Sequence, residues 1–153
     1  MRIAIVGAGG IGGGYGAAFA KSGEDVTFIA RGAHLAAMKT TGLRVEGGRG
    51  AMHVMPVQAT DDPRTVGAVD VVLFCVKSGD TEAVGRQIAP HLRPDVTVLN
   101  LQNGVDNADR LRPLVGGTVV PVAVYVATGM AGPGHVKHHG RGDLLIGNCA
   151  MAE

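Results

Sequence analysis

The sequence contains no tryptophan, only two tyrosines and three phenylalanines, and almost equal numbers of basic and acidic residues, 14 against 13 among 153. A nucleic-acid surface needs a basic face and stacking aromatic side chains, so this composition argues against nucleic acid as a partner. The longest apolar runs cover six to eight residues, whereas a membrane-spanning helix needs about 20. We therefore expect no membrane partner either.

Cysteine is also scarce. Cys75 and Cys149 are the two cysteines, and neither lies in a CxxC pattern or beside a local base. Cys75 falls inside the apolar run 71–76, which predicts a small buried thiol with no redox or catalytic role. The apolar run after Met1 is too short for a secretion signal and leads into glycines instead of a cleavage site. These features predict a cytoplasmic protein.

What the chain does have is glycine, 25 residues of 153, together with enough valine, leucine and isoleucine to form a core. Short apolar runs alternate with segments of helical periodicity. Strands are expected at residues 2–7, 25–30, 69–76, 96–101 and 118–127, and helices at 10–22, 33–40, 80–92 and 107–115. This alternation predicts an α/β fold: a Rossmann-like, doubly wound, mainly parallel sheet with helices on both faces.

Two additional β-hairpins are expected on this framework. Residues 43–46 and 52–57 have short β-like patterns separated by glycines, and residues 135–139 and 143–146 are predicted to pair with each other after a loop at 129–134. No linker or internal repeat interrupts the sequence. We expect one compact domain over residues 1–148.

The first predicted strand leads directly into a GxGxxG pattern formed by Gly7, Ala8, Gly9, Gly10, Ile11 and Gly12. Between a buried strand and a helix, such glycines allow a tight turn, a close approach of backbone to a pyrophosphate, and close packing of helix on strand. The alternative is a glycine-rich turn that binds nothing. The further glycines at 13, 14 and 16 predict a helix that depends on tertiary packing and lies very close to the sheet.

The residue type at the end of the second strand indicates which dinucleotide is bound. An NAD site normally has an acidic residue there, about 20 residues beyond the loop, whereas this sequence has Arg31. A guanidinium can form charge-assisted hydrogen bonds with a 2′-phosphate. The prediction is NADP(H), and the alternative is a solvated surface arginine.

Polar residues follow two more strands at the same predicted edge of the sheet. Lys77 comes directly after the run 69–76, and Asn103 lies in an Asn-Gly pair after the run 96–101. Both are candidates for contacts with cofactor and substrate, although Lys77 could be a solvated tip and Asn103 a simple turn. His135, His138 and His139 are close in sequence, but strand spacing separates two of them onto opposite faces, so no metal site is expected.

Several stretches together resemble the N-terminal NADP-binding domain of the ketopantoate reductases (2-dehydropantoate 2-reductases). The matching stretches are Gly7–Gly13, Ala30–Leu35, Leu73–Lys77, Asp80-Thr81 and Leu101–Val105. They occur in the order typical of that family and span nearly the whole chain. The resemblance implies NADPH-dependent reduction of ketopantoate to pantoate, in the pantothenate and coenzyme A pathway.

By the same resemblance, residues 7–12 hold the pyrophosphate and Arg31 holds the 2′-phosphate. Lys77 and Asn103 contact nicotinamide ribose and the small 2-keto acid substrate, and Ala127 touches the cofactor. In this family the proton-donating lysine belongs to a second, helical domain, which this sequence lacks; residues 149–153 would begin the connection to it. We therefore expect no catalytic residue in this chain, and negligible turnover by it alone.

Two other hypotheses for the function remain open. The chain could be a stand-alone NADPH-binding or sensing module, or the cofactor subunit of a split dehydrogenase acting on another 2-keto or hydroxy acid. In the reductase reading, the missing helical domain is a partner in cis or in trans. An apolar face left exposed where that domain would dock would favour association, such as a homo-oligomer.

Overall fold

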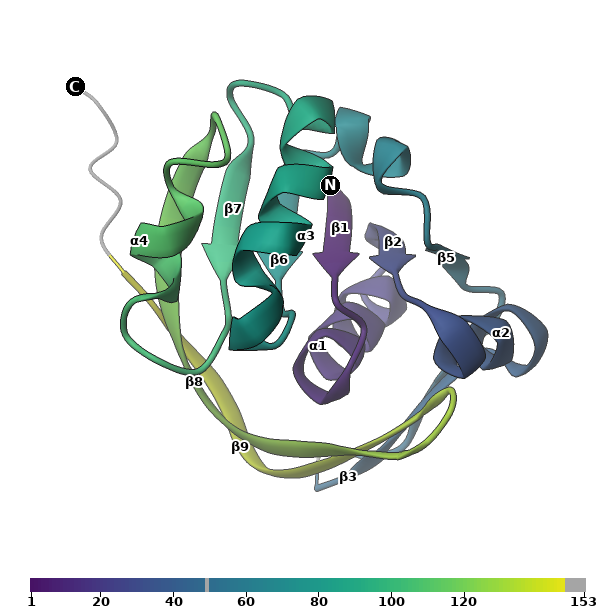
Figure 1. Ribbon diagram of the computed structural model, residues 1–153. Helices are drawn as coiled ribbons and strands as arrows, with labels where there is room; N and C mark the ends of the chain where they lie inside the picture. The colour runs from purple at the N-terminus through teal and green to yellow at the C-terminus, as the bar shows by residue number, and fades with distance from the viewer. Residues whose placement is uncertain (49, 148–153) are drawn as a thin grey trace.

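Within the part of the chain that the structure describes, six of the nine strands form a parallel sheet at the centre (Figure 1). The structure is a computed structural model and describes residues 1–48 and 50–147. The six strands lie in the order β5-β2-β1-β6-β7-β8, and each pairs in parallel with its neighbours. They are β1 (Arg2–Val6), β2 (Asp25–Ile29), β5 (Gln58–Thr60), β6 (Val71–Phe74), β7 (Thr97–Asn100) and the first part of β8 (Thr118–Gly132). This strand order confirms the predicted Rossmann-like fold.

Helices cover both faces of this sheet, and β1 is therefore buried on both sides. Ile3 and Ile5 pack in one core with Ala17 of the first helix, while Ala4 and Val6 pack in a second core on the other face. Such burial explains why β1 is a continuous apolar run without polar alternation. The α-helices are α1 (Gly10–Lys21), α2 (Gly32–Thr41), α3 (Thr81–Ile88) and α4 (Asn107–Leu111), and the 3₁₀ helices are η1 (Pro63–Ala68), η2 (Ser78–Asp80) and η3 (Ala89–His91).

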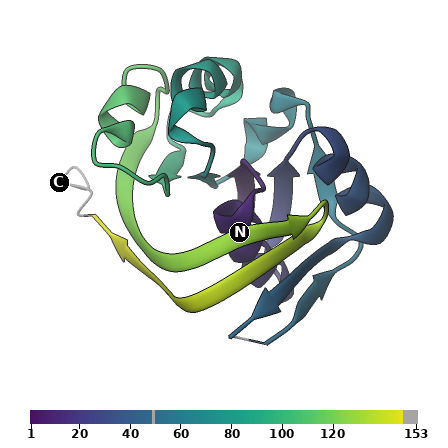
Figure 2. The same ribbon diagram turned by 60° about the horizontal axis from the view of Figure 1, so that its bottom comes forward.

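The remaining strands extend the sheet around α1. Beyond its parallel part, β8 pairs antiparallel with β9 (His135–Ile146), and β9 pairs in parallel with β3 (Leu43–Gly47). The last partner is β4 (Met52–Val54), which forms the predicted hairpin with β3. Figures 1 and 2 show β8 and β9 as a long curved ribbon that leaves the parallel sheet and sweeps around the molecule. As a result α1 contacts the parallel sheet as well as β3, β4, β8 and β9.

The predicted C-terminal hairpin is wrong. Residues 135–139 and 143–146 do not pair with each other, because both belong to the single strand β9. The expected loop at 129–134 is also wrong, since β8 continues to Gly132. Gly140 and Gly142 have φ of +82° and +91°, and the pairing register with β8 shifts in this region. The glycines thus accommodate an irregularity inside a long strand, where the sequence pattern had indicated a turn.

Strand β5 (Gln58–Thr60) was not predicted from the sequence. The predicted strand at 52–57 ends at Val54, and a separate strand begins at Gln58 and pairs with β2. Pro56 lies between the two and has no amide hydrogen to offer a sheet partner, which explains the break. Three residues are too few to show a period. Yet β5 completes the order of the parallel sheet and places Asp61 at its carboxyl edge.

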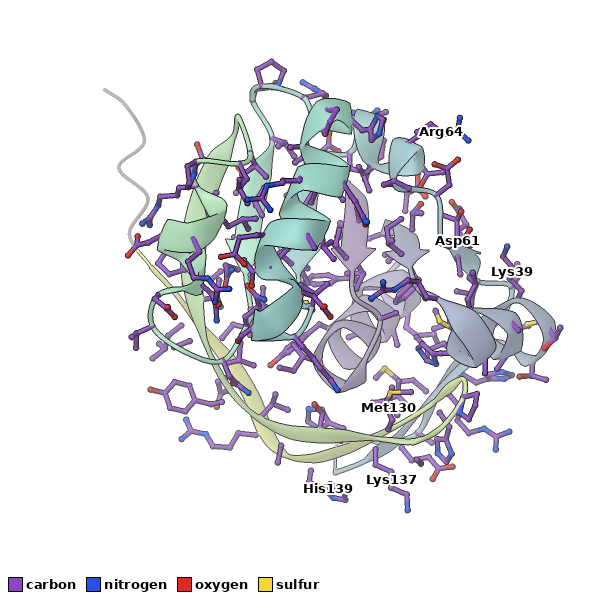
Figure 3. All side chains as sticks on the ribbon, in the orientation of Figure 1. Lys39, Asp61, Arg64, Met130, Lys137 and His139 are labelled. Carbon is purple, nitrogen blue, oxygen red and sulfur yellow. The ribbon has the colours of Figure 1, made fainter. Side chains whose placement is uncertain are left out.

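The two faces of β9 differ in their surroundings. His138 faces α1, where it lines a small hollow with Ile11 and Tyr15, whereas Lys137 and His139 are exposed and point away from α1 (Figure 3). Over the described residues, the helices are all too short or too polar to cross a membrane. Cys149 and the predicted connection at 149–153 lie outside the described residues.

Candidate functional site

The turn between β1 and α1 presents backbone amides at the edge of the sheet. Gly7 has φ of +95°, a conformation that favours glycine, and its amide donates to the Ile29 carbonyl oxygen at 3.2 Å. Gly9 is the N-cap residue and supplies no side chain to the first amides of α1. The bond from the Gly13 amide to the Gly9 carbonyl oxygen is 2.7 Å long, so the amides before Gly13 have no acceptor within the helix. Together with the helix dipole, these amides suit an anion.

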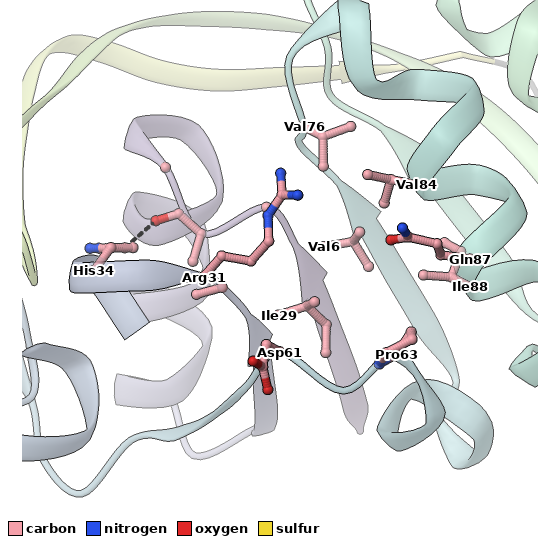
Figure 4. A pocket seen from close by; sticks show the side chains of 14 residues that line it. Val6, Ile29, Arg31, His34, Asp61, Pro63, Val76, Val84, Gln87 and Ile88 are labelled. Carbon is pink, nitrogen blue, oxygen red and sulfur yellow. Dashed lines mark hydrogen bonds between the residues drawn. The ribbon is translucent and has the colours of Figure 1, made fainter. Parts of the chain in front are cut away.

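There is also room for a ligand to approach this backbone. A Cβ placed on Gly9 would have no atom within 4 Å, and Gly9 is exposed. A cavity of about 210 Å³ opens beside the turn, at the carboxyl ends of β1 and β2. Its lining includes Gly7, Ala8 and Gly9 from the turn and Arg31 from the end of β2 (Figure 4).

Arg31 enters this cavity as the sequence analysis anticipated. It is the N-cap residue of α2, and in Figure 4 its side chain extends from the end of β2 towards the loop that joins β1 to α1. The guanidinium forms no ion pair with any part of the chain that the structure describes. An exposed guanidinium in a cavity that also contains the amides of the glycine turn favours a phosphate ligand.

Asp61, which was not singled out from the sequence, lines the same cavity. It follows β5, which the sequence pattern did not reveal. A carboxylate at this position can accept hydrogen bonds from ribose hydroxyls, so the cavity contains one group suited to a phosphate and another suited to a hydroxyl. Recognising Asp61 as a site residue requires knowing that its strand lies next to β2.

A second cavity, of about 230 Å³, contains both of the other predicted polar residues. It lies at the carboxyl ends of β6 and β7 and is lined by Ile11, Cys75, Val76, Lys77, Ser78, Gln102 and Asn103. Val76 also lines the first cavity, so the two adjoin on either side of the glycine turn. The junction lies between β1 and β6, where the order of the strands reverses, which is the usual ligand position in doubly wound sheets.

The cysteine in the second cavity is a weak nucleophile, because burial raises the pKa of the Cys75 thiol to about 12 and so disfavours the thiolate at neutral pH. This agrees with the expected structural role of Cys75.

A buried polar network, not foreseen from the sequence, holds the Lys77 and Asn103 loops together. The Gln102 side-chain amide donates to the Val76 carbonyl oxygen at 2.9 Å and to Thr81 Oγ1 at 2.8 Å, and its oxygen accepts from Asn100 Nδ2 at 2.8 Å. Gln102 therefore binds the residue before Lys77 and itself precedes Asn103. Only its burial, at 6% exposed, distinguishes it from an ordinary surface glutamine.

The buried Asn107 and the half-buried Arg110 continue this network towards the surface. Asn107 Nδ2 donates to the Asn103 carbonyl oxygen at 2.6 Å and to Ser78 Oγ at 3.0 Å, and Arg110 binds both carboxylate oxygens of Glu82 at 2.7 Å. These hydrogen bonds hold the pKa of Glu82 at about 2. The stabilisation by this pair is present above the ordinary glutamate pKa of 4.5 and is lost as the pH falls towards 2.

We expect Gln102→Leu, which changes side-chain volume little, to destabilise the protein strongly. The leucine would leave the Val76 carbonyl, Thr81 and Asn100 short of buried partners, at about 1–3 kcal/mol for each unsatisfied group. Urea unfolding would measure the loss, with Gln87→Leu on the exposed side of α3 as the matched control. Equal unfolding midpoints for the two variants would show that the network does not stabilise these loops.

Ala127 is the predicted site residue with the weakest structural support. It is exposed on β8, opposite His139, and lines neither of the two cavities. Its neighbour Thr128 faces α1, since a Cβ on Gly10 would lie 2.7 Å from Thr128 Oγ1. A role for Ala127 in cofactor binding therefore stays a prediction.

Comparison with known proteins matches the chain to one family. The family model described as ketopantoate reductase PanE/ApbA matches residues 3–150. The 2-dehydropantoate 2-reductase of Pyrococcus horikoshii is 34% identical over 148 residues, which are 96% of this chain and 47% of that protein.

Solved structures show the same likeness. A PanE/ApbA family ketopantoate reductase from Ralstonia eutropha JMP134 has a TM-score of 0.91 at 50% identity, over 95% of this chain and 49% of that one. The complex of D-mandelate dehydrogenase with NADH has a TM-score of 0.83 at 25% identity, over 99% of this chain and 49% of the other. This chain, which spans about half the length of the relatives it matches, thus belongs to the ketopantoate reductase family.

Proposed function

We propose that the chain binds NADP(H) and is the cofactor-binding part of a cytoplasmic 2-dehydropantoate 2-reductase. The observation that carries the proposal is the Arg31 guanidinium, which has no ion-pair partner among the described residues and lines a cavity that also contains the amides of the glycine turn. Residues 7–12 hold the pyrophosphate, and Arg31 holds the 2′-phosphate. Hydrogen bonds to charged groups contribute roughly 1.5–3 kcal/mol, so Arg31 favours NADPH over NADH by about 10- to 100-fold.

Lys77 and Asn103 occupy the adjoining cavity, where we assign them to the nicotinamide ribose and to a 2-keto acid such as ketopantoate. A lysine ammonium attracts a carboxylate, and an asparagine amide both donates and accepts hydrogen bonds. When bound, NADPH supplies the hydride for reduction of the keto carbon. We assign proton donation to a further helical domain, in cis or in trans, so the 153 residues alone bind the cofactor without significant turnover.

An NAD(H)-dependent 2-keto acid reductase is the second candidate function, and Asp61 is the observation that favours it. Its carboxylate lines the cavity predicted to hold the adenosine ribose, where it would accept hydrogen bonds from the 2′-hydroxyl of NADH and repel a 2′-phosphate. The solved D-mandelate dehydrogenase that resembles this chain contains NADH. The two candidates differ in the sign of the cofactor preference.

Titration of the chain with NADPH and NADH, by calorimetry and by thermal shift, distinguishes these candidates. We expect NADPH to bind 10- to 100-fold more tightly and to stabilise the fold by about 2.7 kcal/mol at 100 times its dissociation constant. Absorbance at 340 nm should show negligible NADPH oxidation with ketopantoate. Tighter binding of NADH would establish the second candidate, and no binding of either dinucleotide would refute both.

A further inference from the structure

His34 connects the glycine turn to a part of the chain far away in sequence. It lies on α2, three residues after Arg31, and is half-buried. Its Nε2 is 2.7 Å from the Ala8 carbonyl oxygen (Figure 4), and the Gly134 amide donates to its Nδ1 at 2.9 Å. Gly134 belongs to the turn between β8 and β9, 100 residues further along the chain. One imidazole thus joins the glycine turn, α2 and the curved β8–β9 extension.

These two partners fix the tautomer of the ring. The Gly134 amide can only donate, so Nδ1 must accept and carries no proton. The Ala8 carbonyl can only accept, so Nε2 must carry the proton and donate it. His34 is therefore a neutral imidazole with its proton on Nε2, and the opposite tautomer would make neither bond. Since both ring nitrogens are engaged, His34 has no nitrogen left to bind a phosphate.

The contact with Ala8 controls an amide of the glycine turn. The carbonyl of Ala8 and the amide of Gly9 belong to one planar trans peptide, in which C=O and N–H point in opposite directions. A Cβ on Gly13 would lie 3.1 Å from the Ala8 oxygen, so this oxygen points inward, between α1 and His34. The Gly9 N–H consequently points away from His34 and from the interior, and Gly9 itself is exposed.

We propose that His34 is a positioning residue, which holds the Ala8–Gly9 peptide so that the Gly9 amide faces the pyrophosphate, and which couples this orientation to the β8–β9 turn. The proposal rests on the proposed function, because it concerns how the same turn binds a dinucleotide. It assigns to His34 an effect on affinity in addition to its effect on stability. An imidazole that only connected α2 to the β8–β9 turn would affect the stability of the fold and leave the affinity for NADPH unchanged.

Amide substitutions separate the two contacts of the ring. A glutamine places its amide near the position of Nε2 and retains donation to Ala8, whereas an asparagine places its amide near Nδ1 and retains acceptance from Gly134. We expect His34→Ala and His34→Asn to weaken NADPH binding roughly 3- to 10-fold, the effect of one hydrogen bond, and His34→Gln to bind nearly as the unchanged chain does. His53→Ala is the matched control, because His53 Nε2 contacts the Thr41 carbonyl oxygen at 2.8 Å at the far end of α2.

The measurements are NADPH titration, urea unfolding and the ring ¹⁵N chemical shifts of His34 in the full chain without ligand. Support requires the Nε2-protonated tautomer and an affinity loss in His34→Ala and His34→Asn that His34→Gln and His53→Ala do not share. Unchanged affinity in His34→Ala, or a ring protonated at Nδ1, would overturn the proposal while the proposed function stands. If the unchanged chain binds no NADPH, the proposed function fails, and the role of His34 in cofactor binding fails with it.

Discussion

Gly12→Ala is expected to unfold or severely destabilise the protein. A Cβ at this position would overlap the Gly7 carbonyl oxygen and lie 2.8 Å from Cγ2 of Ile5. The first of these atoms is backbone, so α1 would have to move off the sheet. Forcing atoms into a packed core costs typically 1–3 kcal/mol, and a clash with backbone lies at or above the upper end of that range. Urea unfolding should show a loss of about 3 kcal/mol or more, well above the gain of about 1 kcal/mol from higher helix propensity.

The same substitution at Gly9 separates binding from stability. Gly9 has φ of −69°, which alanine adopts, and open space beside it. Gly9→Ala should therefore change stability by no more than about 1 kcal/mol, while its methyl group obstructs the approach of a pyrophosphate and lowers NADPH affinity roughly tenfold. Gly116→Ala, at an exposed position with similar space, is the neutral control. Equal stability of the Gly9 and Gly12 variants would show that the third glycine of the motif has no packing role.

The glycines after the motif show what the sequence could predict and what it could not. Their number correctly indicated a helix packed very close to the sheet. Gly16 shows this closeness, since a Cβ there would overlap the Phe28 ring. But Gly13 faces the opposite direction, where a Cβ would lie 2.9 Å from Cγ2 of Val136 on β9. Helix α1 needs glycine on both sides because it lies between two layers, and the strand that Gly13 contacts in the second layer comes more than 100 positions later. Local pattern contains no information about that contact.

The candidate site divides in the same way. Arg31, Lys77 and Asn103 follow strands that were recognisable as apolar runs, and the edge of a parallel sheet brings such positions together whatever the intervening sequence. Asp61 and Gln102 were missed for different reasons. Asp61 follows a strand of only three residues, and Gln102 acts through burial, which a single polar residue beside an asparagine does not reveal. The positions of side chains that follow recognisable strands were predictable, whereas the positions of those that depend on tertiary neighbours were not.

Replacing Arg31 with aspartate should abolish or reverse the preference for NADPH over NADH. The guanidinium would no longer pair with the 2′-phosphate, and two carboxylates, the introduced one and that of the native Asp61, would line the same cavity. We expect NADPH affinity to fall about 10- to 100-fold, while NADH, which has a 2′-hydroxyl, binds as well as before or better. Calorimetric titration of each variant with both dinucleotides measures the ratio of the two dissociation constants.

Two further variants serve as comparisons for the ratio of the NADPH and NADH dissociation constants. Arg44→Asp makes the same change of charge at an exposed position on β3, so any general electrostatic effect on an anionic ligand appears there too and can be subtracted. Asp61→Asn removes the competing carboxylate and should strengthen NADPH binding relative to NADH, because like charge in the cavity opposes the additional phosphate. If Arg31→Asp and Arg44→Asp lower NADPH affinity equally, Arg31 does not recognise the 2′-phosphate. Asp61 would then be the charged group that determines the cofactor preference. Because its carboxylate disfavours a 2′-phosphate, the second candidate, binding of NADH, would be supported.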